Sequence, residues 1–158
     1  MKVLRSLIFI GIIIGSVFIY TLEPGPGPVV DPQLVQIWQD WQGDIDSLGI
    51  DVSHRIGRLE RIQISYNMDS HVVGTSDINS QTILISHAIL SQDPARLKCV
   101  VYHELGHHIF KLNHSEDLSI MNKKILPLQL LKQDWTRLKS EYLTQCKNEY
   151  NELSFRFE

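Results

Sequence analysis

The sequence lacks the features of several large classes of protein. It has 15 Lys and Arg against 18 Asp and Glu, a formal net charge of −3, and no basic cluster. Nucleic-acid-binding proteins need a basic surface to neutralise phosphates, so this composition argues against nucleic acid as a partner. Internal repeats and blocks of like charge are absent as well. The 158 residues, 43% of them hydrophobic, fit one domain with an appendage.

Cysteine is scarce, with only Cys99 and Cys146 in the chain. Neither is placed for lipid attachment near the N-terminus. Each falls in a segment with a helical pattern, and we expect these two helices to be neighbours. A Cys99–Cys146 disulfide is one expectation if the domain is exported, and two buried free thiols are the alternative.

One long hydrophobic run is present, at residues 6–22, with Lys2 and Arg5 before it and Glu23 after it. A run of about 17 residues is the lower limit for crossing a bilayer, and no small-x-small cleavage site follows. We therefore expect a single-pass signal anchor, with residues 1–5 cytoplasmic and the following domain extracytoplasmic, either periplasmic or extracellular. Secretion after signal cleavage is the alternative.

The remaining sequence predicts a linker and one α+β domain. Alternating proline and glycine at residues 23–30 favour an extended linker, and the domain is expected at residues 31–158. Apolar residues spaced at helical or period-two intervals predict a mostly antiparallel or mixed sheet packed on two helices. The expected helices are residues 31–48, 94–112 and 127–147, and the expected strands are 59–66, 72–73 and 82–86. Trp38 and Trp41 fall on the apolar face of the first helix, which indicates a core role.

The strongest chemical pattern is His103-Glu104-Leu105-Gly106-His107. Histidines four residues apart on a helix lie on one face, so both imidazoles can reach one metal ion. Glu104 lies beside that ion without ligating it and is suited to accept a proton from an activated water. Asp93 and Pro94 form a helix start, and Gly106 in mid-helix indicates a close contact at the backbone.

Downstream of this helix, His114 and the run Ser119-Ile120-Met121 complete a larger pattern. Together with the 103–107 motif, it resembles the metzincin clan of zinc peptidases, which includes the matrixins. The resemblance covers about 20 residues. It implies a small zincin-like domain with one catalytic Zn²⁺, His114 as the third ligand and Met121 in a structural turn below the metal. No cysteine precedes the domain, so cysteine-based latency is not available.

This sequence departs from the clan pattern in the turn after the helix. Phe110 holds the position of the usual glycine, Asn113 holds the position of the usual histidine, and His114 comes one residue later. Asn113 tolerates the left-handed conformation that this bend needs, so we expect the turn there. Asp117 and Glu116 remain alternatives as third ligand, because carboxylates also bind zinc.

The expected activity is that of a membrane-anchored zinc metalloendopeptidase, a hydrolase of peptide or protein substrates, with Glu104 as general base. One alternative is a non-catalytic zinc-binding or adhesion domain of metzincin shape. Another is a different zinc peptidase class that takes its third ligand from a distant helix, such as Glu141. The resemblance also implies that the strand before the motif helix, residues 83–87, is a sheet edge that binds extended peptide, although an ordinary edge strand is equally compatible.

Four further histidines, His54, His71, His87 and His108, are not expected to bind metal. The first three lack ligand spacing, and His108 points away from the face shared by His103 and His107. Cys99 lies a full turn before His103 and is also an unfavourable ligand. The sequence does not define the oligomeric state or the cleavage preference.

Overall fold

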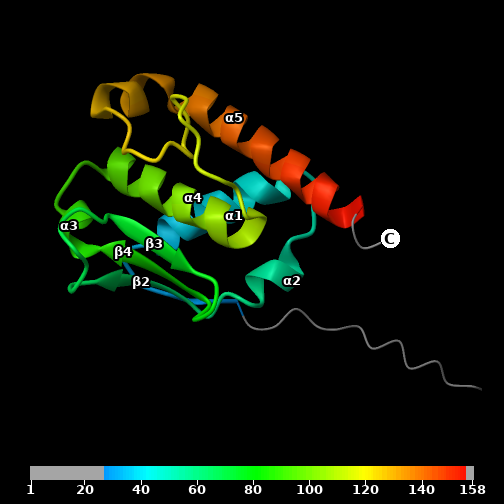
Figure 1. Cartoon of the computed structure of the whole chain (residues 1–158), viewed down its shortest axis with the longest axis horizontal. Coiled ribbons are helices and arrows are strands. Elements are labelled where there is room, and N and C mark those ends of the chain that lie inside the picture. Colours follow the sequence, from blue (N-terminus) through cyan, green and yellow to red (C-terminus); the bar gives the residue numbers. More distant parts are fainter. Residues whose placement is uncertain (1–26, 156–158) are drawn as a thin grey trace, which may run out of the picture.

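The computed structural model describes residues 27–155 and contains one mixed four-stranded sheet. The strand order is β1-β2-β4-β3, in which β1, β2 and β4 run parallel and β3 pairs with β4 in the antiparallel sense. The helices cover one side of this sheet (Figure 1), so the fold is α+β with a mixed sheet. The strands are β1 (Val29–Val30), β2 (Arg61–Ser65), β3 (Gly74–Asp77) and β4 (Thr82–Ser86).

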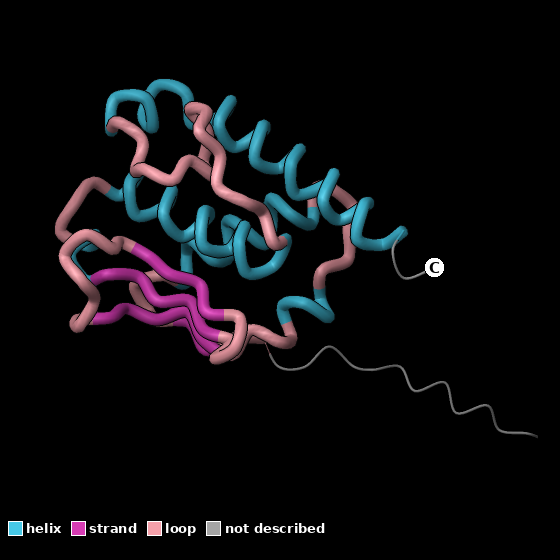
Figure 2. The backbone as a smooth tube through the Cα atoms, viewed as in Figure 1, coloured by secondary structure: helices cyan, strands magenta, loops and turns pink. Residues whose placement is uncertain are grey.

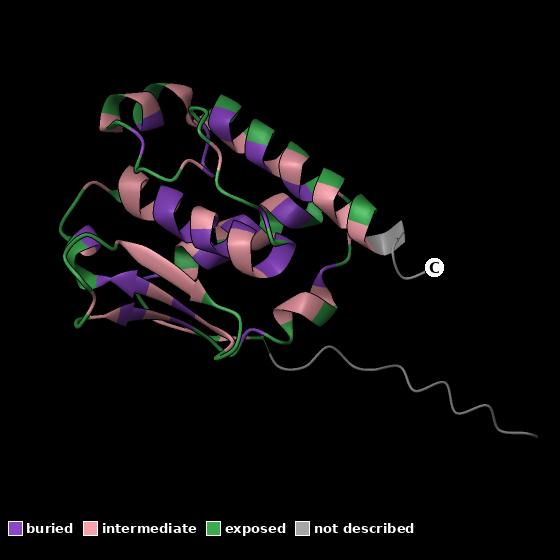
Figure 3. Cartoon of the chain, in the orientation of Figure 1, coloured by how far each residue is buried: buried purple, intermediate pink, exposed green. Residues whose placement is uncertain are grey.

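The central element is the helix that carries the 103–107 motif, α4 (Pro94–Phe110). It begins where expected, because the Asp93 carboxylate accepts a hydrogen bond from the Ala95 N–H at 2.9 Å and Pro94 fills the first turn. On one side α4 packs against β3 and β4, and on the other side it packs against the last helix. Buried residues accordingly occur around most of its circumference (Figure 3). This position makes α4 a rigid support for its polar side chains.

Two long helices pack on α4, namely α1 (Val35–Asp46) and α5 (Leu128–Phe155). Trp41 is fully buried, and its indole N–H donates to the Tyr142 hydroxyl at 3.0 Å, which joins α1 to α5. Trp38 stacks on Trp41 with ring centroids 5.4 Å apart, which confirms the core role predicted for both tryptophans. Two short helices, α2 (Ser53–Ile56) and α3 (His87–Leu90), complete the domain, and Figure 2 shows the loops that connect these elements.

None of the helices within residues 27–155 has both the length and the apolar composition needed to cross a membrane. The longest, α5, has 28 residues but carries charged side chains along its length. This finding corrects the predicted fold class, which included an N-terminal transmembrane helix, and the predicted single-pass membrane localisation. Residues 6–22, to which those predictions referred, lie outside the described residues, as do residues 1–5.

The order of the strands corrects the predicted sheet edge. The strand expected at residues 82–86 is present as β4, but it lies between β2 and β3 and is therefore interior. The edge beside α4 is β3, which begins at Gly74 rather than at residue 72 and folds back onto β4. Sheet order depends on long-range pairing, which the local pattern of residues 83–87 does not encode.

The structure distinguishes the two alternatives for the cysteines, and the last helix is longer than predicted. Cys99 and Cys146 are buried free thiols, the alternative to a disulfide. Burial raises the pKa of each thiol to about 12, so neither is a reactive thiolate near neutral pH. Helix α5 extends eight residues beyond the predicted end at residue 147, and the partly buried Tyr150 packs against the core there.

Candidate metal centre

Three histidine side chains converge where α4 meets the loop that follows it. His103 and His107 lie one turn apart on α4, and their Nε2 atoms are 3.0 Å apart. His114 comes from the loop, and its Nε2 atom lies 3.1 Å from that of His107. The three side chains each offer one nitrogen within 4.8 Å of the others, close enough to hold one metal ion.

Backbone carbonyls fix the tautomers of the two helical histidines. His103 donates from Nδ1 to the Ile120 carbonyl at 2.8 Å, and His107 donates from Nδ1 to the Leu112 carbonyl at 2.6 Å. A carbonyl only accepts, so each Nδ1 carries the hydrogen and each neutral ring presents a free lone pair at Nε2. Such carbonyl partners orient metal-binding histidines in many proteins.

The environment keeps His103 and His107 in the neutral form that metal binding requires. Burial lowers the pKa of His103 to about 4 and also lowers the pKa of His107. Two unprotonated Nε2 atoms that face each other repel through their lone pairs unless a cation lies between them. Tetrahedral Zn–N bonds of about 2.05 Å place neighbouring nitrogens about 3.3 Å apart, close to the observed spacing. The donor set therefore fits a tetrahedral metal with one further position for water.

The loop between α4 and α5 delivers both His114 and the two orienting carbonyls. Its first residue, Lys111, ends the helix in the left-handed conformation, with φ 57° and ψ 29°. The bend is thus at Lys111 and not at Asn113, which corrects the predicted position. The residue at the glycine position of the clan pattern, Phe110, is fully buried and contacts Trp41 at a centroid distance of 6.3 Å. Burial of this ring explains why the helix continues to residue 110.

Met121 packs against the backbone of α4 at Gly106, the residue before His107. A Cβ atom added at Gly106 would lie 2.8 Å from the Met121 sulfur and 3.0 Å from a ring carbon of Tyr142. The close contact expected at this glycine is therefore present. The Ser115 N–H donates to the Met121 carbonyl at 2.8 Å, which closes the loop directly after His114.

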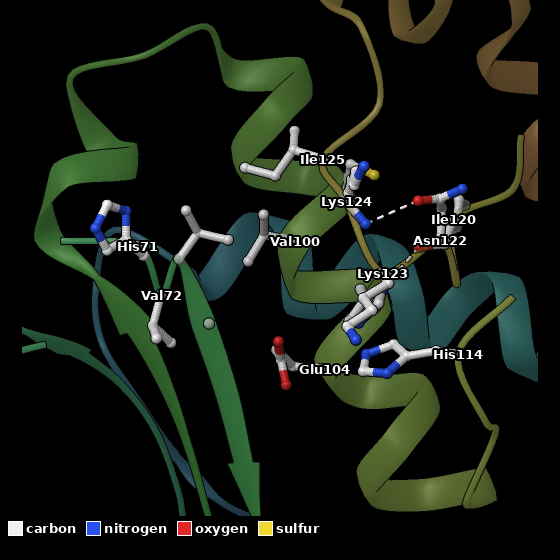
Figure 4. A pocket seen from close by; sticks show the side chains of 14 residues that line it. His71, Val72, Val100, Glu104, His114, Ile120, Asn122, Lys123, Lys124 and Ile125 are labelled. Atoms are coloured by element: carbon white, nitrogen blue, oxygen red, sulfur yellow. Dashed lines mark hydrogen bonds between the residues drawn. The ribbon is translucent and has the colours of Figure 1, made fainter. Parts of the chain in front are cut away.

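Glu104 is buried beside the histidine cluster and lines the same cavity as His103 and His114 (Figure 4). Its carboxylate packs on the edge strand, where a Cβ added at Gly74 would lie 2.7 Å from Oε1. Burial raises the pKa of Glu104 to about 7. A carboxyl group with this pKa can both accept and release a proton near neutral pH.

The alternative ligands lie elsewhere. Among residues 27–155, the group of side chains that could hold a metal contains neither Glu116 nor Asp117. The backbone carbonyls of these two residues are instead hydrogen-bonded by the Asn122 amide. Glu141 is paired with Arg137 at 2.8 Å.

The remaining histidines and Cys99 also stay out of the cluster. His108 is held to the edge strand by a 2.9 Å hydrogen bond between Nδ1 and the Ser76 hydroxyl. His87 stacks on Tyr66, and the His54 ring is 2.9 Å from the Arg58 guanidinium. His71 lines the cavity beside Glu104, although it is not part of the triad.

Sequence reasoning did not find Gly74 or the two carbonyls that orient the histidines. Gly74 follows two valines with no motif around it, so only the packing of β3 against α4 shows its importance. Carbonyl groups occur at every residue and carry no sequence signal.

Comparisons with known proteins give no match, whether to a family model, to a curated protein or to a solved structure.

Proposed function

We propose that this protein is a zinc-dependent endopeptidase whose metal ligands are His103, His107 and His114. The observation that carries the proposal is the convergence of three Nε2 atoms, with two of these histidines, His103 and His114, lining one cavity together with the buried Glu104 carboxylate. Three neutral imidazoles suit Zn²⁺ and leave a fourth position open, as catalytic zinc sites require. The metzincin resemblance supports this donor set, and Met121 packs against Gly106 in the helix that carries two of the three histidines.

Zinc at this site supplies a Lewis acid that activates a water molecule and polarises the substrate carbonyl. Glu104 accepts a proton from the attacking water as the new C–O bond forms. When the C–N bond breaks, Glu104 transfers that proton to the departing amine. Its buried position in the cavity that His103 and His114 also line suits both halves of this transfer.

The edge strand β3 provides a means of holding an extended substrate beside Glu104. β3 is paired only on its β4 side, and Gly74 brings its backbone against the Glu104 carboxylate. An extended peptide can add to such an edge through main-chain hydrogen bonds. The binding of extended peptide, which was expected at residues 83–87, is therefore proposed for the edge strand at residues 74–77.

The direct test compares the wild-type protein with Glu104→Gln, using zinc stoichiometry and cleavage of a random peptide library as the two measurements. The variant keeps the shape of the side chain but cannot act as a base, so we expect unchanged zinc content. Cleavage should fall at least a hundredfold, the usual scale of general-base catalysis.

His114→Ala should lose zinc, whereas Glu141→Ala serves as a control that keeps both zinc and cleavage. A wild-type protein that holds zinc yet cleaves no peptide would contradict the proposal and favour a zinc-binding domain. Retention of zinc by His114→Ala together with loss from Glu116→Ala or Asp117→Ala would assign the third ligand to a carboxylate.

A further inference from the structure

The cavity beside the histidine cluster combines an apolar wall with a cationic rim. It has a volume of about 280 Å³ and extends from Glu104 and His114 to His71 (Figure 4). Its apolar lining comes from the segment just before β3, from α4 and from the loop before α5, through Val72, Val73, Val100, Ile120 and Ile125. Such a lining accepts an aliphatic stem.

Two lysines from one loop, Lys123 and Lys124, line the same cavity. In Figure 4 the Lys123 side chain extends from the loop toward the side of the cavity where Glu104 and His114 lie. Neither lysine forms an ion pair with any residue in the range 27–155. Lysines elsewhere differ in this respect, since Lys98 and Lys139 each pair with an aspartate of α1.

Within residues 27–155, Glu104 is the only acidic residue that lines this cavity. Its side chain is the proposed general base, so no other carboxylate among these residues lies at the lysine rim. Glu116 and Asp117 belong to the same loop but do not line the cavity. The cavity thus combines an apolar part of its wall with lysines that have no ion-pair partner within residues 27–155.

We infer that this cavity binds a carboxylate of the substrate on the side of the scissile bond next to Glu104, with Lys123 as the principal partner and Lys124 in support. This inference rests on the proposed peptidase function. The carboxylate has two chemical sources, a glutamate or aspartate side chain next to the cleaved bond or the C-terminal carboxylate of a short peptide. In either case the aliphatic stem lies on the apolar wall while the charge meets the lysines.

The first experiment cleaves random decapeptide mixtures, prepared as free acids and as C-terminal amides, and identifies the products by mass spectrometry. For a side-chain carboxylate, we expect Glu and Asp to exceed Gln and Asn next to the cut by roughly tenfold at low salt in both mixtures. For a terminal carboxylate, we expect cuts near the C-terminus in the free acids alone. Because both lysines are exposed, either preference should shrink in 1 M salt.

Variants of Lys123 and Lys124, with a matched control elsewhere, test whether these two lysines cause the preference for acidic substrates. Lys123→Glu should abolish or reverse the preference, Lys124→Glu should weaken it, and Lys123→Arg should keep it. Lys147→Glu changes the net charge equally on an exposed part of α5 outside this cavity, so it should behave as the wild type. Equal zinc content in all variants shows that folding is intact.

A binding measurement separates failure of this inference from failure of the proposed function. N-acetyl-glutamate amide and N-acetyl-glutamine amide are titrated into isotope-labelled Glu104→Gln protein, and NMR shifts are followed at Val72, Val100 and Lys123. Stronger binding of the glutamate probe, lost in Lys123→Glu, supports the cavity even if no peptide is cleaved. Equal binding of the two probes, or cleavage without any acidic preference, overturns the inference while leaving a peptidase in place.

Discussion

Gly106 lies in the middle of α4, where glycine ordinarily weakens a helix by about 1 kcal/mol relative to alanine. A Cβ atom here would meet the Met121 sulfur at 2.8 Å and the Tyr142 ring at 3.0 Å, and both side chains are buried. We therefore expect Gly106→Ala to lower the free energy of unfolding by about 1–3 kcal/mol, as overpacked substitutions do.

The matched control is Gly43→Ala in α1, where nothing lies within 4 Å of an added Cβ. It should raise the free energy of unfolding by roughly 1 kcal/mol. Urea unfolding of the two variants measures both effects, and stabilisation of Gly106→Ala would show that Met121 and Tyr142 do not pack tightly against the helix at Gly106.

Lys111 is one of two non-glycine residues with positive φ within residues 27–155. A side chain in the left-handed region costs roughly 1 kcal/mol, and glycine removes that cost at the end of a helix. Lys111→Gly should therefore raise the free energy of unfolding by about 0.5–1 kcal/mol. Lys111→Ala keeps a Cβ and should bring no such gain in the same urea titration.

At the scale of elements, the packing of β3 on α4 controls the position of Glu104. A Cβ at position 74 would lie 2.7 Å from the Glu104 carboxylate and 2.8 Å from the Val100 side chain. Gly74→Ala should displace one of these groups, which lowers kcat/KM by roughly tenfold or more because catalytic geometry tolerates little displacement.

Since Glu104 is not a metal ligand in this proposal, the zinc content of Gly74→Ala should be unchanged. Thr75→Ala, on the same strand, is the control for a general disturbance of β3. Full peptidase activity in Gly74→Ala would show that the strand does not constrain the carboxylate.

The local elements of this fold were more predictable than their arrangement. The start of α4 follows from Asp93 and Pro94, and β4 occupies residues 82–86, the span predicted for that strand. The sheet order, by contrast, depends on β3 folding back onto β4, a pairing between segments whose sequences do not specify it. The extension of α5 past residue 147 depends on the packing of its last turns against the core. The polar sequence of this stretch does not predict that packing.

The candidate metal site was predictable to a similar degree. Spacing alone places His103 and His107 on one face of a helix. The resemblance predicted His114 as the third residue of the group, and the structure brings it beside the other two. The position of the turn required the structure, because Lys111 is a residue with no preference for a left-handed bend.

At the scale of the whole molecule, a metal at the three histidines should stabilise the fold. The ligands come from α4 and from the loop that follows it, so metal binding favours the folded state over the unfolded chain. At zinc concentrations about a thousandfold above Kd, the melting temperature should exceed that of chelator-treated protein by roughly 10 °C. His114→Ala should show a much smaller difference in scanning calorimetry, and equal melting temperatures for the wild type would argue against a metal at this site.

The packing of α1 and α5 on α4, with α1 and α5 joined by the Trp41–Tyr142 hydrogen bond, has a consequence for biosynthesis. A nascent chain that has reached residue 127 already contains all three histidines, yet it lacks the helix whose Tyr142 covers Gly106 and bonds to Trp41. Until α5 leaves the ribosome, α4 has no partner on that face. Metal binding in the cell is therefore expected to follow completion of the last helix, so that an incomplete chain would not yet hold a metal at the three histidines.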